Sequence, residues 1–189
     1  MSEIIFTYLR QPLNRYTFKA PKTRAWVEAL CQGKAVLNLF AGPTRLNGCI
    51  EVANDIDPAI PGTLFQMDAL ECAKMFRETG ELFDVVLIDG PYSYRKSMEL
   101  YHGHKNSRFK QLCDVIPDIL TPHGIVITFG YHSRVMGEKR GFRVREICVI
   151  SHGGAQRDTL AAVAEKMDKL DGDTIATVEE RIITVPGST

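Results

Sequence analysis

Residues 83–92 read Phe-Asp-Val-Val-Leu-Ile-Asp-Gly-Pro-Tyr. The run from Val85 to Ile88 is apolar at every position, whereas a strand with one solvated face alternates apolar and polar residues. The run therefore predicts a strand that is covered on both faces, as in a parallel sheet between helices. Asp89-Gly90-Pro91 follows directly and predicts the end of the strand, because glycine and proline interrupt regular structure.

Six further apolar runs resemble this one, and helical patterns lie between them. We expect the other strands at residues 35–40, 50–54, 64–67, 124–129, 142–150 and 159–164, and helices at 23–32, 69–79 and 107–120. Pro117 is expected to kink or shorten the last helix. Strands that alternate with helices favour an open α/β sheet, here mostly parallel and of about seven strands. We interpret residues 1–165 as one domain with a basic N-terminal arm, and 166–189 as a C-terminal tail.

Composition excludes several classes of protein. The chain has 189 residues, 44% of them hydrophobic, and no apolar run approaches the roughly 20 residues of a membrane span. Its five cysteines are scattered and include no C-x-x-C pair, which argues against a disulfide scaffold or a zinc ribbon and favours a reducing, cytoplasmic location. His102 and His104 have no third ligand at a suitable spacing, so we expect no metal site.

Charge is balanced overall but unevenly distributed. Segments 1–24, 93–112 and 134–145 each hold five basic residues and one acidic residue, although the whole chain has 23 of each sign. A protein with one polyanion-facing side shows this asymmetry, so the three segments predict a nucleic-acid partner. The alternative is that solvated loops simply collect charge.

Ligands of open α/β sheets bind outside the carboxyl ends of the strands. In this sequence the relevant strand ends carry Ala41-Gly42, Asp55 with Asp57, Asp68, and Asp89-Gly90-Pro91-Tyr92. Each of these alone is typical of a turn, but four consecutive strands share the feature. His152-Gly153-Gly154, after the sixth run, could reach the rim of this site, although we favour a turn. No G-x-G-x-x-G is present, which argues against NAD or FAD.

From about residue 30 to 165, this order of motifs resembles the class I S-adenosylmethionine (SAM) dependent methyltransferases, which have a Rossmann-like fold. Residues 36–44 are similar to their first motif. The resemblance implies that Asn38, Phe40, Ala41 and Gly42 lie at the methionine part of SAM. It also implies that Asp55, or as second choice Asp57, accepts hydrogen bonds from the ribose hydroxyls, and that Asp68 receives the adenine amino group.

The sequence Asp89-Gly90-Pro91-Tyr92 is similar to the Asp-Pro-Pro-Tyr motif of methyltransferases that modify exocyclic amino groups, such as adenine N6. The resemblance implies that these four residues are catalytic. Asp89 and the backbone carbonyl of Gly90 would accept the two N–H groups of the target amine, Pro91 would shape the loop, and Tyr92 would stack on the base. Catalysis would then consist mainly of positioning and electrostatics.

The sequence also departs from the family pattern. Asn38 stands where an acidic residue is usual, Thr44 where glycine is frequent, and Gly90 where the first proline of the motif is usual. The stretches after the first and second strands are short. We therefore expect the helices there to be abbreviated or replaced by loop, leaving a more open SAM pocket.

These observations predict a SAM-dependent N-methyltransferase acting on a nucleobase amino group, with adenine N6 in DNA as the first choice. A chain of this length leaves no room for a separate recognition domain. The enzyme would read little sequence, rely on a protein partner, or act on structured RNA. The alternatives are an rRNA or tRNA base methyltransferase, and a degenerate non-catalytic module that binds nucleic acid or serves as a scaffold. The basic segments argue against a small-molecule substrate.

Overall fold

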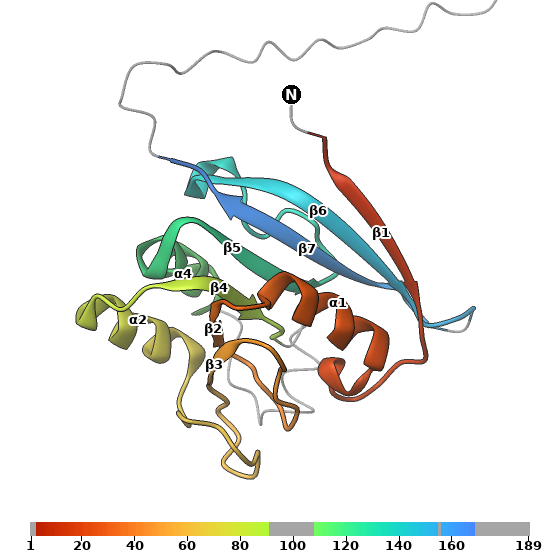
Figure 1. Ribbon diagram of the computed structural model, residues 1–189, viewed down its shortest axis with the longest axis horizontal. Coiled ribbons are helices and arrows are strands. Elements are labelled where there is room, and N and C mark those ends of the chain that lie inside the picture. The colour runs from red at the N-terminus through yellow and green to blue at the C-terminus, as the bar shows by residue number, and fades with distance from the viewer. Residues whose placement is uncertain (1–2, 91–107, 155, 169–189) are drawn as a thin grey trace, which may run out of the picture.

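The computed structural model describes residues 3–90, 108–154 and 156–168 (Figure 1). The strands are β1 Ile5–Arg10, β2 Ala35–Asn38, β3 Ile50–Ala53, β4 Phe83–Ile88, β5 Leu120–Gly130, β6 Phe142–Ser151 and β7 Thr159–Lys166. The α-helices are α1 Pro21–Cys31, α2 Ala69–Thr79 and α4 Phe109–Val115. The 3₁₀ helices that these ranges describe in full are η1 Thr17–Lys19, η3 Ile116–Ile119 and η4 Glu138–Arg140.

The seven strands form one sheet in the order β1-β6-β7-β5-β4-β2-β3. The pairs β1–β6, β5–β4, β4–β2 and β2–β3 are parallel, and β7 runs antiparallel to both β5 and β6. Five of the six residues of β4 are buried, as expected for a strand with both faces covered. The predicted α/β architecture, a mostly parallel sheet of seven strands, is thus confirmed.

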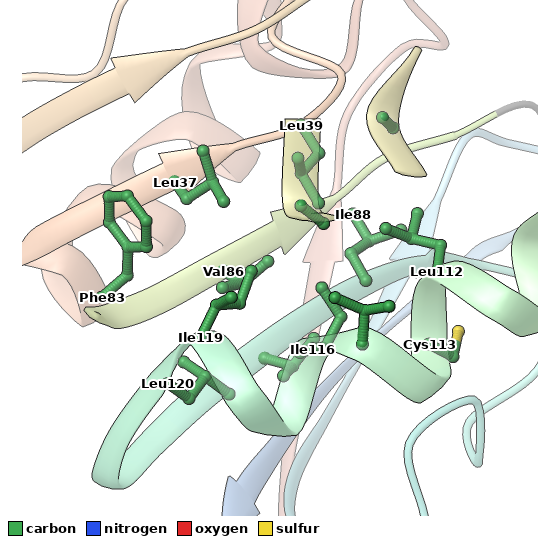
Figure 2. Close-up of a cluster of buried hydrophobic side chains, with 14 of the residues drawn as sticks. Leu37, Leu39, Phe83, Val86, Ile88, Leu112, Cys113, Ile116, Ile119 and Leu120 are labelled. Atoms are coloured by element: carbon green, nitrogen blue, oxygen red, sulfur yellow. The ribbon is translucent and has the colours of Figure 1, made fainter. Parts of the chain in front are cut away.

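Two apolar clusters pack on opposite faces of this sheet. On one face, α2, α4 and η3 cover β2 and β4; Figure 2 shows Leu112, Ile116 and Ile119 directed towards Val86 and the strands. On the other face, α1 and η1 contribute Val27, Cys31 and Phe18 to a cluster with β5, β6 and β7. Figure 1 shows α1 lying across the sheet on that side. The two clusters therefore shield most of both sheet faces from solvent, so we expect a ligand to bind at the ends of the strands.

Helix α2 has the bounds that the sequence predicts, because both ends carry strong signals. The Asp68 side chain accepts hydrogen bonds from the backbone N–H groups of Leu70 and Glu71, which caps the N-terminus. Gly80 ends the helix with φ of 73°, the left-handed conformation that glycine adopts most easily.

Two predicted elements are shorter than expected. The strand expected at 64–67 is reduced to one parallel bridge between Asn54 and Phe65. The Asn54 side chain accepts a hydrogen bond from the Met67 N–H and donates one to the Met67 carbonyl, so these backbone groups do not pair with a neighbouring strand. The helix expected at 107–120 begins at Phe109 and tightens to a 3₁₀ turn at Ile116, next to Pro117, which lacks an N–H donor.

The N-terminal segment is partly a strand, and its interpretation as a basic arm is wrong for residues 5–10. These residues form β1, which pairs with β6 at the edge of the sheet. Leu9 packs against the core, and the Thr7 hydroxyl donates to Glu146 on β6. Phe6 and Tyr8 alternate with them and are exposed. Exposure alternates along this strand but hydrophobicity does not, because the exposed residues include two aromatic ones, so the sequence gives no period-two signal here.

Candidate active site

A pocket opens beside the carboxyl ends of β2, β3 and β4, where the sequence predicts a ligand. Its lining includes seven of the predicted site residues, namely Phe40, Ala41, Gly42, Asp55, Asp57, Asp89 and Gly90. Pro91 and Tyr92 lie outside the described residues. The structure therefore brings the Gly42 turn, the pair Asp55 and Asp57, and Asp89-Gly90 to one pocket, although they are separated by up to 50 positions in the chain.

The glycine turn after β2 has a conformation that explains its sequence. Gly42 has a φ of 57°, which disfavours residues with a side chain. A Cβ atom built there would also lie 3.3 Å from the Tyr16 ring. Pro43 to Cys49 then return to β3 without a helix, so the abbreviation expected from the spacing is confirmed.

Asp55 organises the floor of this pocket. One carboxylate oxygen, Oδ2, accepts the N–H of Gly42 at 2.9 Å, and Oδ1 accepts the N–H of Asp57 at 3.0 Å. The residue is 5% exposed. Asp57 is less buried, and its Oδ1 accepts the N–H of Ala59 at 2.9 Å. Asp55 therefore links the end of β3 to the Gly42 turn by a hydrogen bond. Asp57 presents a more accessible carboxylate to the same pocket.

Asp89 and Gly90 lie where β4 ends, and the structure explains why glycine replaces proline at the second position. A Cβ atom at Gly90 would lie only 3.1 Å from Cζ of Phe40, in the turn after β2. The aromatic ring thus occupies the space next to the Gly90 backbone. A side chain at position 90 would require the Phe40 ring to shift by a few tenths of an ångström.

Asn38 and Asp68 are not part of the pocket lining, unlike the other predicted cofactor-binding residues. Asn38 is fully buried and donates from Nδ2 to Oε1 of Glu51 on the neighbouring strand at 2.8 Å. Asp68 caps α2 and forms an ion pair with Arg108, at 3.4 Å from Nη1. Both side chains therefore make structural contacts, and their expected contacts with SAM stay predictions.

The N-terminal segment forms the side of the pocket that the sequence did not reveal. Leu13, Asn14, Arg15 and Tyr16 line it together with Gln11. The Gln11 side chain is buried and contacts Thr23 at the start of α1 through two hydrogen bonds. The only sequence signal was the excess of basic residues in segment 1–24, which does not by itself indicate a pocket.

His152 also belongs to the pocket, so the structure supports the alternative that it reaches the rim of the site over a turn alone. Its ring bridges the backbone carbonyl of Gln11 at 3.2 Å and the hydroxyl of Thr159 at 2.9 Å. It thereby connects the N-terminal segment to the ends of β6 and β7. A lone histidine followed by two glycines gives no sequence signal for such a bridge.

Several basic residues of the predicted nucleic-acid segments form ion pairs with carboxylates of this chain. Arg108 pairs with Asp68 and Glu71, Arg140 with Asp114, and Arg143 with Glu165. By contrast, Arg15 and Lys19 lie over the ring of Tyr16, 5.4 and 5.2 Å from its centroid. Residues 93–107 lie outside the described part of the chain.

The remaining chemical features are few. All five cysteines are free thiols, and four of them are buried. Within residues 3–90, 108–154 and 156–168, no three His, Cys, Asp or Glu side chains are grouped to hold a metal ion. The same ranges contain no helix that is long and apolar enough to span a bilayer.

The sheet order, the antiparallel β7 and the pocket at the carboxyl edge define the Rossmann-like fold of class I SAM-dependent methyltransferases. No protein-family model and no curated protein sequence matches the chain. Solved structures do match. N-methyltransferase NodS from Bradyrhizobium japonicum superposes with a TM-score of 0.56 at 15% identity, over 82% of this chain and 100% of NodS.

Two further similar structures are longer proteins. TrmN from Thermus thermophilus has a TM-score of 0.54 and 18% identity, over 78% of this chain and 49% of TrmN. A candidate SAM-dependent methyltransferase from Streptococcus mutans has a TM-score of 0.57 and 16% identity, over 76% of this chain and 48% of that protein. The match thus spans about half the length of both. At these identities the likeness shows the fold.

Proposed function

We propose that this chain is a SAM-dependent N-methyltransferase that acts on an exocyclic amino group of a nucleobase, with adenine N6 in DNA as the first choice. One observation carries the proposal: Asp89 and Gly90, at the end of β4, line the same pocket as the Gly42 turn and the two carboxylates Asp55 and Asp57. A cofactor site and a candidate amine-binding site are therefore adjacent.

The residues that line the pocket suit SAM. Gly42 lets the backbone come close to a ligand, which the amino-acid part of SAM requires. Asp57 and Asp55 offer carboxylate oxygens to ribose hydroxyls, and Ile60 and Phe40 add apolar surface. One similar structure, NodS, has been solved in complex with S-adenosylhomocysteine. When bound, SAM supplies an electrophilic methyl group.

The role of Asp89 follows from the chemistry of aryl amines. Such a nitrogen is a weak nucleophile because its lone pair is delocalised into the ring. If the Asp89 carboxylate accepts one N–H and the Gly90 carbonyl accepts the other, the lone pair becomes localised on nitrogen and is directed at the methyl group. The nitrogen loses its proton after it has gained the methyl group, so a strong base is not required. Positioning then contributes most of the rate.

A nucleic-acid substrate is supported by the group formed by Arg15, Tyr16 and Lys19 at the pocket. Two cations beside an aromatic ring match a phosphate next to an unstacked base. Because Arg108, Arg140 and Arg143 have carboxylate partners within the chain, we assign substrate contact first to the N-terminal segment. An rRNA or tRNA base would fit the same group, and a protein partner would supply sequence recognition.

The proposal is tested by methyl transfer from tritiated SAM to duplex DNA, single-stranded DNA, rRNA and tRNA. Asp89→Ala should lower transfer by about 100-fold or more and leave SAM affinity within about twofold of wild type, because alanine has no acceptor for the N–H of the amine. Asp118→Ala, which removes an exposed carboxylate on η3, is the matched control and should be fully active.

Each outcome has a distinct meaning. Full activity of Asp89→Ala would refute the catalytic assignment. Calorimetry that detects no SAM binding up to millimolar concentrations would indicate the non-catalytic module instead. Transfer to small-molecule amines but to no nucleic acid would refute the substrate class while leaving the reaction type intact.

A further inference from the structure

Three buried side-chain atoms make no hydrogen bond in the described part of the chain, and they belong to only two residues. They are Oδ1 of Asn38 and the Nε and Nη1 atoms of Arg45. Asn38 ends β2, and Arg45 lies three residues after Gly42. Buried polar atoms without partners are rare and cost stability, so their concentration beside the glycine turn calls for an explanation.

Glu51 on β3 is the centre of this cluster. Its side chain is 6% exposed. Oε1 accepts from Nδ2 of Asn38 at 2.8 Å, and Oε2 accepts from the N–H of Leu46 at 2.9 Å. Nη1 of Arg45 lies 3.9 Å from Oε1, an ion-pair distance that is too long for a hydrogen bond. Arg45 is thus the cation that offsets a nearly buried carboxylate.

The other end of the guanidinium reaches the glycine turn. Nη2 of Arg45 donates a hydrogen bond to the backbone carbonyl of Gly42. The N–H of Gly42 is held by Asp55, as described above. Both polar backbone groups of Gly42 are therefore held by side chains. Arg45, in the loop after β2, binds the carbonyl, and Asp55, at the end of β3, binds the N–H.

These contacts replace those of a helix. If a helix began after the turn, the N–H of Leu46 would donate to the carbonyl of Gly42, the i to i−4 bond of an α-helix. Here Glu51 accepts the Leu46 N–H, and Arg45 donates to the Gly42 carbonyl. Each of the two backbone groups has found a side-chain partner, and the two side chains form an ion pair.

We propose that Arg45 and Glu51 are positioning residues that hold the Gly42 turn in its SAM-binding conformation in place of the missing helix. The inference rests on the proposed SAM site. It predicts that Arg45 controls affinity for SAM and has little influence on the transfer step itself, because the guanidinium contacts the turn and is not among the residues that line the pocket.

The test uses Arg45→Met, Glu51→Gln and the double variant, with SAM titrated calorimetrically and thermal unfolding measured in parallel. Arg45→Met should weaken SAM binding by about tenfold or more and lower the melting temperature, because Glu51 keeps a buried charge without its cation. In the double variant, removal of that charge should recover part of the lost melting temperature, because glutamine keeps only one of the two acceptor oxygens of Glu51. SAM binding should stay weak, because the Gly42 carbonyl still lacks its donor.

Arg143→Met with Glu165→Gln is the matched control, since this ion pair joins β6 to β7 away from the turn. It should leave SAM affinity unchanged. In the methyl-transfer assay, Arg45→Met should raise KM for SAM while kcat at saturating SAM stays within about twofold, a split that general destabilisation does not produce. Arg45→Lys should be intermediate, because an ammonium lacks the fork that reaches both partners.

Three results would overturn the inference. Arg45→Met could bind SAM within twofold of wild type, which would show that the Gly42 turn keeps its conformation without Arg45. The double variant could recover affinity together with melting temperature, and Arg45 would then only balance the charge of Glu51. If the wild-type chain binds no SAM, the proposed function fails and this inference fails with it, a result distinct from the other two.

Discussion

Asp55→Asn is the substitution that best tests how the pocket is built. The carboxylate of Asp55 accepts two backbone N–H groups, from Gly42 and Asp57, in a setting that is 5% exposed. An asparagine has one acceptor oxygen, so it can satisfy one of the two donors and turns an amide NH₂ towards the other. A buried donor left without an acceptor costs about 1–3 kcal/mol.

This cost is measurable as stability and as affinity. For a chain of this size, about 1–3 kcal/mol lowers the melting temperature by roughly 2–12 °C. If Asp55 also accepts the ribose hydroxyls, SAM affinity falls by a similar free energy, which corresponds to roughly 5- to 150-fold in Kd. Thermal unfolding followed by circular dichroism and calorimetric titration with SAM give the two quantities on the same sample.

Asp57→Asn is the matched control and separates the two carboxylates. Asp57 accepts one N–H, from Ala59, at an exposed position, so its substitution should lower the melting temperature by only a few degrees. If Asp57→Asn weakens SAM binding as much as Asp55→Asn does, Asp57 is the ribose-binding residue and Asp55 only shapes the turn. Unchanged stability and affinity in Asp55→Asn would refute the reasoning about both hydrogen bonds.

Three further predictions follow from individual contacts. Gly90→Ala should lower methyl transfer, because its Cβ would meet the Phe40 ring at 3.1 Å; Phe40→Leu should partly restore activity in the double variant, and additive losses would contradict the coupling. Asp68→Ala should cost about 0.5–2 kcal/mol of unfolding free energy through loss of the α2 cap, and chemical denaturation that shows no change would exclude the capping role. Burial raises the pKa of Cys31, Cys72 and Cys148 to about 12 and that of Cys113 to about 11. These thiols are protonated in the folded state and ionise near pH 9 once unfolded, so stability is retained below pH 9 and should fall as the pH rises from 9 towards 11. At pH 8 a thiol reagent should modify only Cys49 in the native protein, and rapid modification of a second cysteine would show that the core opens.

Much of the sheet was predictable because its signals are local. The apolar run in β4 and the cap and glycine of α2 each give an element with its correct bounds, and the motif residues at the ends of β2, β3 and β4 do line one pocket. Contacts between distant segments were not predictable. The hydrogen bond between His152 and Gln11 joins residues 141 positions apart, and the sequence around neither residue indicates it.

The residues that depart from the family pattern bear on whether the domain is a degenerate module. Gly90 replaces a proline, and the Phe40 ring packs against it. The helix after the first turn is missing, and Arg45 with Glu51 takes over its hydrogen bonds to Gly42 and Leu46. Arg45 gives the Gly42 carbonyl a donor and Glu51 gives the Leu46 N–H an acceptor, so the short loop leaves neither backbone group unpaired. A Gly42 turn held in this way supports the proposed SAM site over the non-catalytic module.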